Sequence, residues 1–171
     1  MSAKWKNILI LALGIALLPP IWAVLAPHFG VSTGAVALIC AGLYVASGNN
    51  VRDGVKISLG FLCGDVWAVL ALLVMKLLPL NEELELFITL FVMGALAVII
   101  SSAVPKIIYT PSWLCGWAIG LSLMAPVGID SVGTLPIEIG VAMLVGVWYV
   151  GAGVDAFTKL IAKITTKKNN R

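Results

Sequence analysis

Charged side chains are scarce in this chain. Only 11 % of its 171 residues are Asp, Glu, Lys or Arg and 61 % are apolar, whereas average soluble domains have about 25 % charged residues. The mean hydropathy is +1.08. A single water-soluble core cannot bury that much apolar surface. The composition therefore excludes a soluble enzyme, a secreted disulfide scaffold, a disordered linker and a nucleic-acid-binding protein, and it predicts an integral membrane protein.

Residues that bind metals or act as nucleophiles are also few. The chain has one histidine, His28, and no CxxC, HExxH or Cys/His pattern, so we expect neither a metal site nor a cofactor. Cys40, Cys63 and Cys115 lie within apolar stretches, which argues against a disulfide framework. A membrane-embedded enzyme would need a nucleophile, a metal set or an acid–base pair, and we therefore expect no enzyme.

Apolar stretches, by contrast, fill the chain. A transmembrane helix needs about 20 predominantly apolar residues, and period-2 alternation is absent. Division at charges and at Pro, Gly and Asn clusters gives six stretches: Asn7–Leu25, Val31–Ser47, Val55–Leu78, Leu86–Val104, Ser112–Ala125 and Ile137–Ile164. The breaks between them are too short for a soluble domain. The predicted fold class is all-α: residues 1–171 form one transmembrane domain, a polytopic membrane protein with six transmembrane helices.

The basic residues predict the orientation. If the N-terminus is cytoplasmic and every stretch crosses, ten of the eleven Lys and Arg, from Lys4 to Arg171, lie on the cytoplasmic side and only Lys76 lies outside. This bias follows the positive-inside rule, so we expect both termini in the cytoplasm. The basic tail then orients the last helix and is attracted to membrane lipid. We expect no nucleic-acid partner.

The two halves of the chain give a candidate 3+3 inverted repeat. The matching pairs are Gly14 with Gly94, Gly60 with Gly140, and Trp67 with Trp148. Three helices per half would make the second half enter the membrane from the opposite side, which is typical of many transporters and channels. A glycine-rich chain also gives such matches by chance, so the sequence leaves the repeat open.

The second and fifth stretches are short and occupy matching positions in the two halves. Such segments point to a solute site near the bilayer midplane. They could also be re-entrant hairpins, but the charge bias favours thin spans. In the first stretch, Pro19 and Pro20 predict a bent or broken helix, because proline lacks the N–H donor and clashes with the preceding turn. That break could form a gate or a cavity wall, or it could be a static kink.

Asp65 is the main candidate for the solute or proton pathway. It lies about ten residues into the third stretch, near the bilayer centre, where a carboxylate costs on the order of 2.5–3.5 kcal/mol. It should therefore face the bundle interior or water. Asp65 could act as a proton relay, accept hydrogen bonds from a solute or hold a cation. A neutral Asp65 bonded to a neighbouring group is the structural alternative.

Other residues carry weaker signals. Small residues at four-residue spacing predict helix-packing faces, and they are Gly60, Gly64 and Ala68 on the third stretch and Gly116 and Gly120 on the fifth. Trp67 and Asp155 are secondary candidates for the pathway. Asp155 precedes Lys159 by four residues, and an i,i+4 ion pair is its simpler interpretation. Glu138 begins the last stretch, where a carboxylate complements the helix dipole.

Three segments carry a resemblance: IWAVLAPHFGVSTGAVALICAGLYVASG, GDVWAVLALL and TPSWLCGWAIGLSL. Together they resemble small bacterial inner-membrane proteins of the YcdZ type, a domain-of-unknown-function family, over about residues 8–155. The resemblance implies a location in the bacterial cytoplasmic membrane. It transfers no site residue, because the family has no motif of catalytic weight.

These patterns predict a channel or secondary transporter for a small neutral or weakly polar solute. Few charges occur within the apolar stretches, which fits such a solute better than a multivalent ion. One chain makes a thin bundle around a pore, so we expect a homo-oligomer with a pathway in each protomer. The alternative is a non-transporting interaction or assembly subunit, whose small-residue faces dock another protein.

Overall fold

The structure is a computed structural model that describes residues 3–78 and 80–169. Every regular element within this part of the chain is helical. The elements in chain order are α1 (Ala3–Leu25), η1 (Ala26–Phe29), α2 (Val36–Ala46), α3 (Val51–Leu77), α4 (Glu82–Ala103), α5 (Thr110–Met124), α6 (Leu135–Val145), η2 (Gly146–Ala152) and α7 (Gly153–Asn169).

Local sequence explains where several helices begin. The side chain of Asn50 accepts a hydrogen bond from the backbone N–H of Arg52 at the start of α3, and Asn81 does the same for Leu84 at the start of α4. Both are N-caps of the preferred residue type. Proline occupies the first turn of α5 and of α6, where its missing N–H leaves no helical bond unmade.

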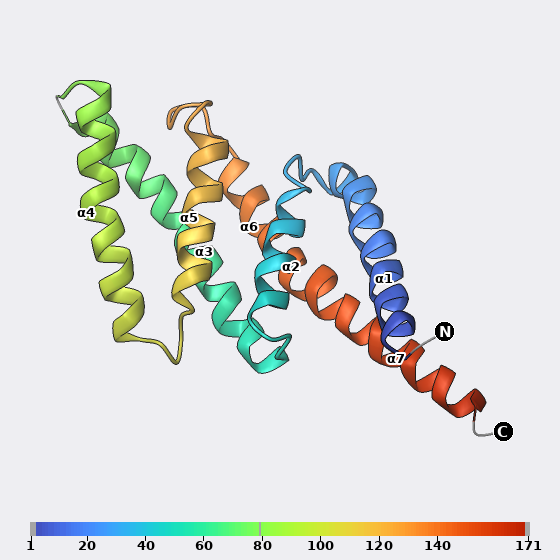
Figure 1. Cartoon of the computed structure of the whole chain (residues 1–171). Coiled ribbons are helices and arrows are strands. Elements are labelled where there is room, and N and C mark those ends of the chain that lie inside the picture. Colours follow the sequence, from blue (N-terminus) through green and yellow to red (C-terminus); the bar gives the residue numbers. More distant parts are fainter. Residues whose placement is uncertain (1–2, 79, 170–171) are drawn as a thin grey trace.

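The helices form a broad, shallow bundle with α4 at one edge and α1 at the other (Figure 1). The long helix α3 packs mainly on α5, and α2 packs on η2 and α6. The edge helix α1 contacts α7, while α4 contacts α3 and α5. The buried core therefore follows the two long helical segments, α3 and α6–η2–α7.

Four helical segments are long and apolar enough to cross a membrane: Ile8–Phe29, Val51–Leu77, Glu82–Ala103 and Leu135–Ile164. Helix α2 has 11 residues and α5 has 15, so they extend about 16 Å and about 22 Å at 1.5 Å per residue. Both are shorter than the hydrocarbon core of about 30 Å. The structure thus supports a multi-pass membrane protein, but it does not confirm the six-span count.

Two local predictions need correction. The helix expected from Val31 begins only at Val36, because residues 32–35 form turns. Helix α1 continues through Pro19 and Pro20 without interruption, so of the predicted bend or break, the break does not occur. A helix tolerates proline in lipid where neighbouring groups satisfy the freed carbonyls.

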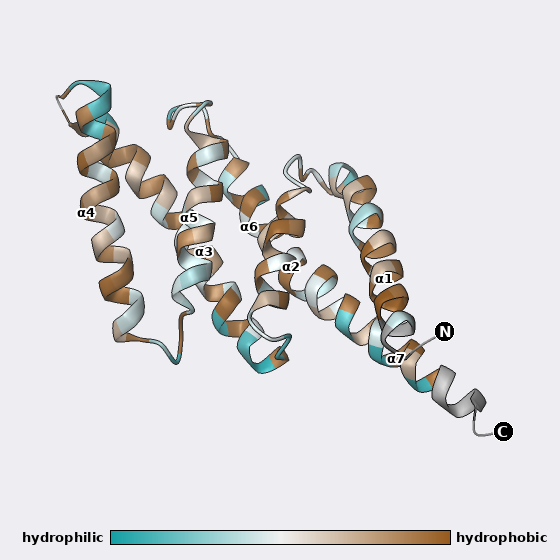
Figure 2. Ribbon diagram, viewed as in Figure 1, coloured by the Kyte–Doolittle hydropathy of each residue, from teal (hydrophilic) through white to brown (hydrophobic). Residues whose placement is uncertain are grey.

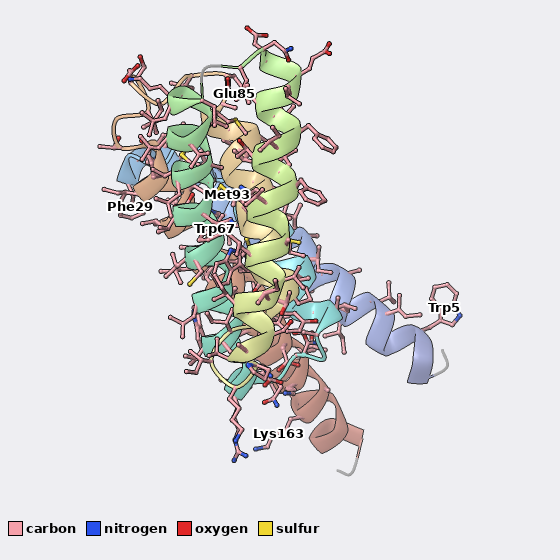
Figure 3. The ribbon with its side chains drawn as sticks, turned by 90° about the vertical axis from the view of Figure 1, so that its left-hand side faces the viewer. Trp5, Phe29, Trp67, Glu85, Met93 and Lys163 are labelled. Atoms are coloured by element: carbon pink, nitrogen blue, oxygen red, sulfur yellow. The ribbon has the colours of Figure 1, made fainter. Side chains whose placement is uncertain are left out.

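The ends of the bundle differ in charge. Hydrophilic residues gather at the helix ends, and apolar residues cover the outer faces between them (Figure 2). Glu85 lies at one end and Lys163 at the other (Figure 3). The start of α1 and the end of α7 both lie toward the Lys163 end, but they are apart from each other (Figure 3). Arg171, which the orientation prediction also uses, lies outside the described residues.

The last long helix contains a wide turn that the sequence pattern does not predict. Residues Gly146–Ala152 form the π-helix η2 between α6 and α7. Gly146 lies directly against the backbone of Ala37 and the side chain of Cys40 on α2, and a Cβ atom at Gly146 would overlap both. π-helical turns are rare and frequently occur at functional sites.

Candidate functional site: a buried carboxyl group between three helices

The contact between α3 and α5 is the most extensive between the described helices, and we call it the α3–α5 seam. Its members are the small residues Gly60, Gly64 and Ala68 on α3 and Gly116 and Gly120 on α5. A Cβ atom on Gly64 would overlap the backbone of Trp113, and one on Gly116 would lie 2.5 Å from the carbonyl oxygen of Phe61. The two backbones therefore touch, as they do at other small-residue contacts between membrane helices.

Asp65 lies on the same face of α3, at the point where α6 joins the seam. Its side chain is buried, with 6 % relative exposure. A Cβ atom on Gly120 of α5 would lie 3.3 Å from Oδ1 of Asp65, and one on Gly140 of α6 would lie 3.7 Å from Oδ2. Because Gly120 and Gly140 have no side chains, there is room between α5 and α6 for the carboxyl group of Asp65.

Oδ1 of Asp65 is buried and has no hydrogen-bond partner. Buried polar atoms in proteins are nearly always hydrogen-bonded, and an unpaired one is destabilising. Among the described residues, Asp65 is the only Asp, Glu, Lys or Arg in the buried class. The arrangement therefore supplies a hydrogen-bond acceptor, held by three helices, that no protein group uses.

Trp67 follows Asp65 by two residues but serves another contact. Its indole Nε1 donates a hydrogen bond to the carbonyl oxygen of Met93 on α4, at 3.1 Å (Figure 3). Its ring meets that of Trp113 edge to face, with centroids 5.4 Å apart. Trp67 thus links α3 to α4 and α5. The indole N–H groups of Trp113 and Trp117 on α5 are buried without a partner.

The structure places the remaining pathway candidates away from Asp65. Pro19 and Pro20 line a cavity of about 410 Å³ between α1, α2 and η2. Asp155 lies at the start of α7 and lines a separate cavity of about 410 Å³. It forms the i,i+4 ion pair with Lys159, at 2.6 Å. Asp65 lines neither cavity, so it does not share a site with Pro19 and Pro20 or with Asp155.

Glu138 has a role that the sequence analysis missed. Its carboxylate accepts hydrogen bonds from the backbone N–H of Ser32 at 2.9 Å, from Ser32 Oγ at 2.6 Å and from Thr134 Oγ1 at 2.9 Å. It thereby fixes the segment before α2 to the start of α6. The sequence signal was only that of a carboxylate in a first helical turn, because Ser32 lies 106 residues away.

The part of the chain that the structure describes contains no group of three or more His, Cys, Asp or Glu side chains that could hold a metal ion. The three cysteines are free thiols.

Together, the helices and their apolar outer faces define an integral, all-helical membrane protein. The chain belongs to the family described as "Protein of unknown function (DUF1097)", whose sequence profile matches residues 12–159. This match supports an uncharacterised-domain family and does not confirm the resemblance to proteins of the YcdZ type. Comparison with curated proteins and with solved structures found no match.

Proposed function

We propose that this protein is a channel or secondary transporter for a small neutral or weakly polar solute, and that the solute passes Asp65. The observation that carries the proposal is the buried Oδ1 of Asp65, which has no hydrogen-bond partner. A solute that donates an N–H or O–H would provide the missing bond on its way through. Burial of an ionisable residue among membrane helices is typical of substrate and ion pathways.

The surroundings of Asp65 favour a small solute. Gly120 and Gly140 flank the carboxyl group, and the next atoms beside Gly140 belong to the apolar side chain of Leu62. A solute beside Asp65 would therefore meet one acceptor and mostly apolar walls. This chemistry suits a compact, uncharged hydrogen-bond donor better than a multivalent ion.

The pairing of the helices supports an inverted repeat as part of this proposal. Helix α3 of the first half packs on the short helix α5 of the second, and α6–η2 of the second half packs on the short helix α2 of the first. Each long helix thus packs on the short helix of the other half. In transporters with inverted repeats, the solute site lies where the two repeats meet, and Asp65 lies at such a contact.

The orientation and assembly complete the proposal. The start of α1 and the end of α7 both lie toward the Lys163 end of the bundle. Under the positive-inside rule, this supports cytoplasmic termini in a bacterial inner membrane. Apolar residues cover the outer face of α4. That face is available to lipid or to further copies in a homo-oligomer with one pathway per protomer.

The test is solute flux into proteoliposomes, followed by light scattering. The panel contains urea, acetamide and glycerol, with ammonium and formate as weakly ionic solutes. We expect wild type to accelerate the entry of at least one neutral solute over empty vesicles. Asp65→Asn keeps an acceptor oxygen but removes its charge, and the weaker hydrogen bond to the solute should slow that flux by about tenfold.

Two further variants sharpen the flux test. Gly140→Ala adds one methyl group beside the carboxyl of Asp65 and should also reduce flux. Asp53 lies on the same helix and forms a partly exposed ion pair with Lys56. The control variant Asp53→Asn should leave flux unchanged. Folded protein that accelerates no solute would contradict the transport proposal and favour an interaction or assembly subunit. Equal flux in wild type and Asp65→Asn would remove Asp65 from the pathway.

A further inference from the structure

A long groove lies between α1 and α2, over η2 and α7, and we call it the α1 groove. Three cavities of about 410, 410 and 180 Å³ make it up, and the smallest shares lining residues with each of the other two. Its walls are α1, α2, η2 and the start of α7. Between Ile8 and Pro20 it extends about 18 Å at 1.5 Å per residue.

The length and the chemistry of the groove match one leaflet of a membrane. Half of a hydrocarbon core of about 30 Å is about 15 Å, close to the length of the groove. Its middle part is lined by apolar side chains and by two glycines, Gly42 and Gly151. A Cβ atom on Gly42 would meet nothing within 4 Å. This part of the groove has the shape and polarity to hold an acyl chain.

The end of the groove nearest to Lys163 is polar. Asn49, Asp155, Thr158 and Lys159 line it. The carboxylate of Asp155 is sheltered, with 16 % side-chain exposure, whereas Lys159 is 71 % exposed. Their ion pair joins one oxygen of Asp155 to the ammonium of Lys159, so it leaves the second carboxylate oxygen and further N–H donors for a ligand.

Two buried polar atoms at this end have no partner. Oδ1 of Asn49 is one, and the hydroxyl of Tyr44 is the other. Tyr44 is fully buried and lies within electrostatic reach of Asp155 and Lys159. Asn49 follows the end of α2 by three residues and has a left-handed φ of +56°. The unpartnered Oδ1 of Asn49 and the carboxylate of Asp155 line the same cavity. Both are acceptors, so a ligand that donates N–H groups would complement them.

We propose that the α1 groove binds a phospholipid with a zwitterionic phosphoethanolamine headgroup, and that one acyl chain lies between α1 and α2. The ammonium of the headgroup donates hydrogen bonds to Asp155 and to Oδ1 of Asn49, while its phosphate accepts them from Lys159. The charges of the pair complement those of the headgroup. A choline headgroup lacks N–H groups and cannot make the bonds to Asp155 and Asn49. This site is independent of the proposed pathway at Asp65.

The test is native mass spectrometry of delipidated protein with equal amounts of phosphatidylethanolamine and phosphatidylcholine that have the same acyl chains. We expect wild type to prefer phosphatidylethanolamine by about tenfold, the discrimination given by one hydrogen bond to a charged group. Asn49→Gly, which suits the positive φ, and Asp155→Asn should each bring the ratio close to one. Equal binding of the two lipids by wild type would overturn the headgroup assignment.

A second set of variants tests the groove itself. Gly42→Leu fills its open middle part and should reduce the binding of both lipids. The matched control Ala95→Leu adds the same side chain on the exposed face of α4 and should change nothing. Circular dichroism verifies that each variant is folded. Unchanged lipid binding in Gly42→Leu would overturn the proposal. A dimer that Gly42→Leu dissociates would instead assign the groove to a second copy of the chain.

Discussion

The α3–α5 seam and the α1 groove are both contacts between apolar helices, yet one is closed and the other is open. At the seam, glycines stand where the backbones touch, and a methyl group at Gly64 would overlap the backbone of α5. Along the groove, α1 presents large side chains such as Leu11 and Ile15. A Cβ atom added at Gly42 of α2 would meet nothing within 4 Å.

This difference shows that small residues alone do not close a contact between helices. Lipid is as apolar as a leucine side chain, so membrane helices approach only where shape and polar groups favour it. At the seam the small residues of α3 and α5 lie against each other, whereas Gly42 of α2 lines the groove together with the large side chains of Leu11 and Ile15 on α1. The seam can therefore hold the buried carboxyl of Asp65 in place, and the groove stays available to a ligand.

The largest expected effect compares one methyl group at the two contacts. We expect Gly64→Ala to lower the free energy of unfolding by about 3 kcal/mol or more, since backbone atoms must move apart. Gly42→Ala should instead be neutral or raise it by up to about 1 kcal/mol, because alanine is the better helix former. Unfolding by SDS in mixed micelles, followed by circular dichroism, measures both.

Equal losses of stability in Gly64→Ala and Gly42→Ala would contradict the distinction between a closed seam and an open groove. Gly140→Ala provides an intermediate case. Its Cβ atom would lie 3.3 Å from Leu62 Cδ2, a side-chain atom that can shift, so its effect on stability should fall between the other two.

A smaller effect is expected at the contact between the seam and α4. Trp67→Phe removes the hydrogen bond to the carbonyl oxygen of Met93 but keeps an aromatic ring beside Trp113. The free energy of unfolding should fall by about 1 kcal/mol. Phe87→Leu, on the exposed face of α4, should change it by less than about 0.5 kcal/mol. A larger loss in Phe87→Leu, measured in the same way, would show that another contact holds α4.

Much of the helical pattern is predictable from the sequence, since charges and turn residues interrupt the apolar stretches. The stretch Val55–Leu78 corresponds to α3, and Ser112–Ala125 corresponds to α5. Helix α2 begins later than the stretch from Val31 predicts, because residues 32–35 form turns and Ser32 bonds to Glu138, a contact that no local pattern reveals. The π-helix η2 begins at Gly146, which lies against Ala37 and Cys40 of α2, and no local pattern reveals that contact.

The candidate sites differ in how far the sequence indicates them. Asp65 stands out because a carboxylate in the middle of an apolar stretch is costly, and its small neighbours suggest an inward face. The partners Gly120 and Gly140 come from two other helices, and only the fold brings them to the carboxyl group. Asn49 and Lys159 both line the polar end of the α1 groove. They are far apart in the chain, so no sequence spacing predicts that they lie at one site.

If a solute reaches Asp65 in the folded protein, a thiol at this position should react with a small reagent, and cysteine accessibility measures that reaction. Sealed proteoliposomes with Asp65→Cys are treated with methanethiosulfonate ethylammonium, and mass spectrometry of peptides locates the modified thiol. Ala97→Cys is the matched control, because Ala97 lies fully buried on α4. We expect the thiol introduced by Asp65→Cys to be modified at a rate about tenfold higher than the thiol introduced by Ala97→Cys. Equal, negligible modification of both in folded protein would contradict the account.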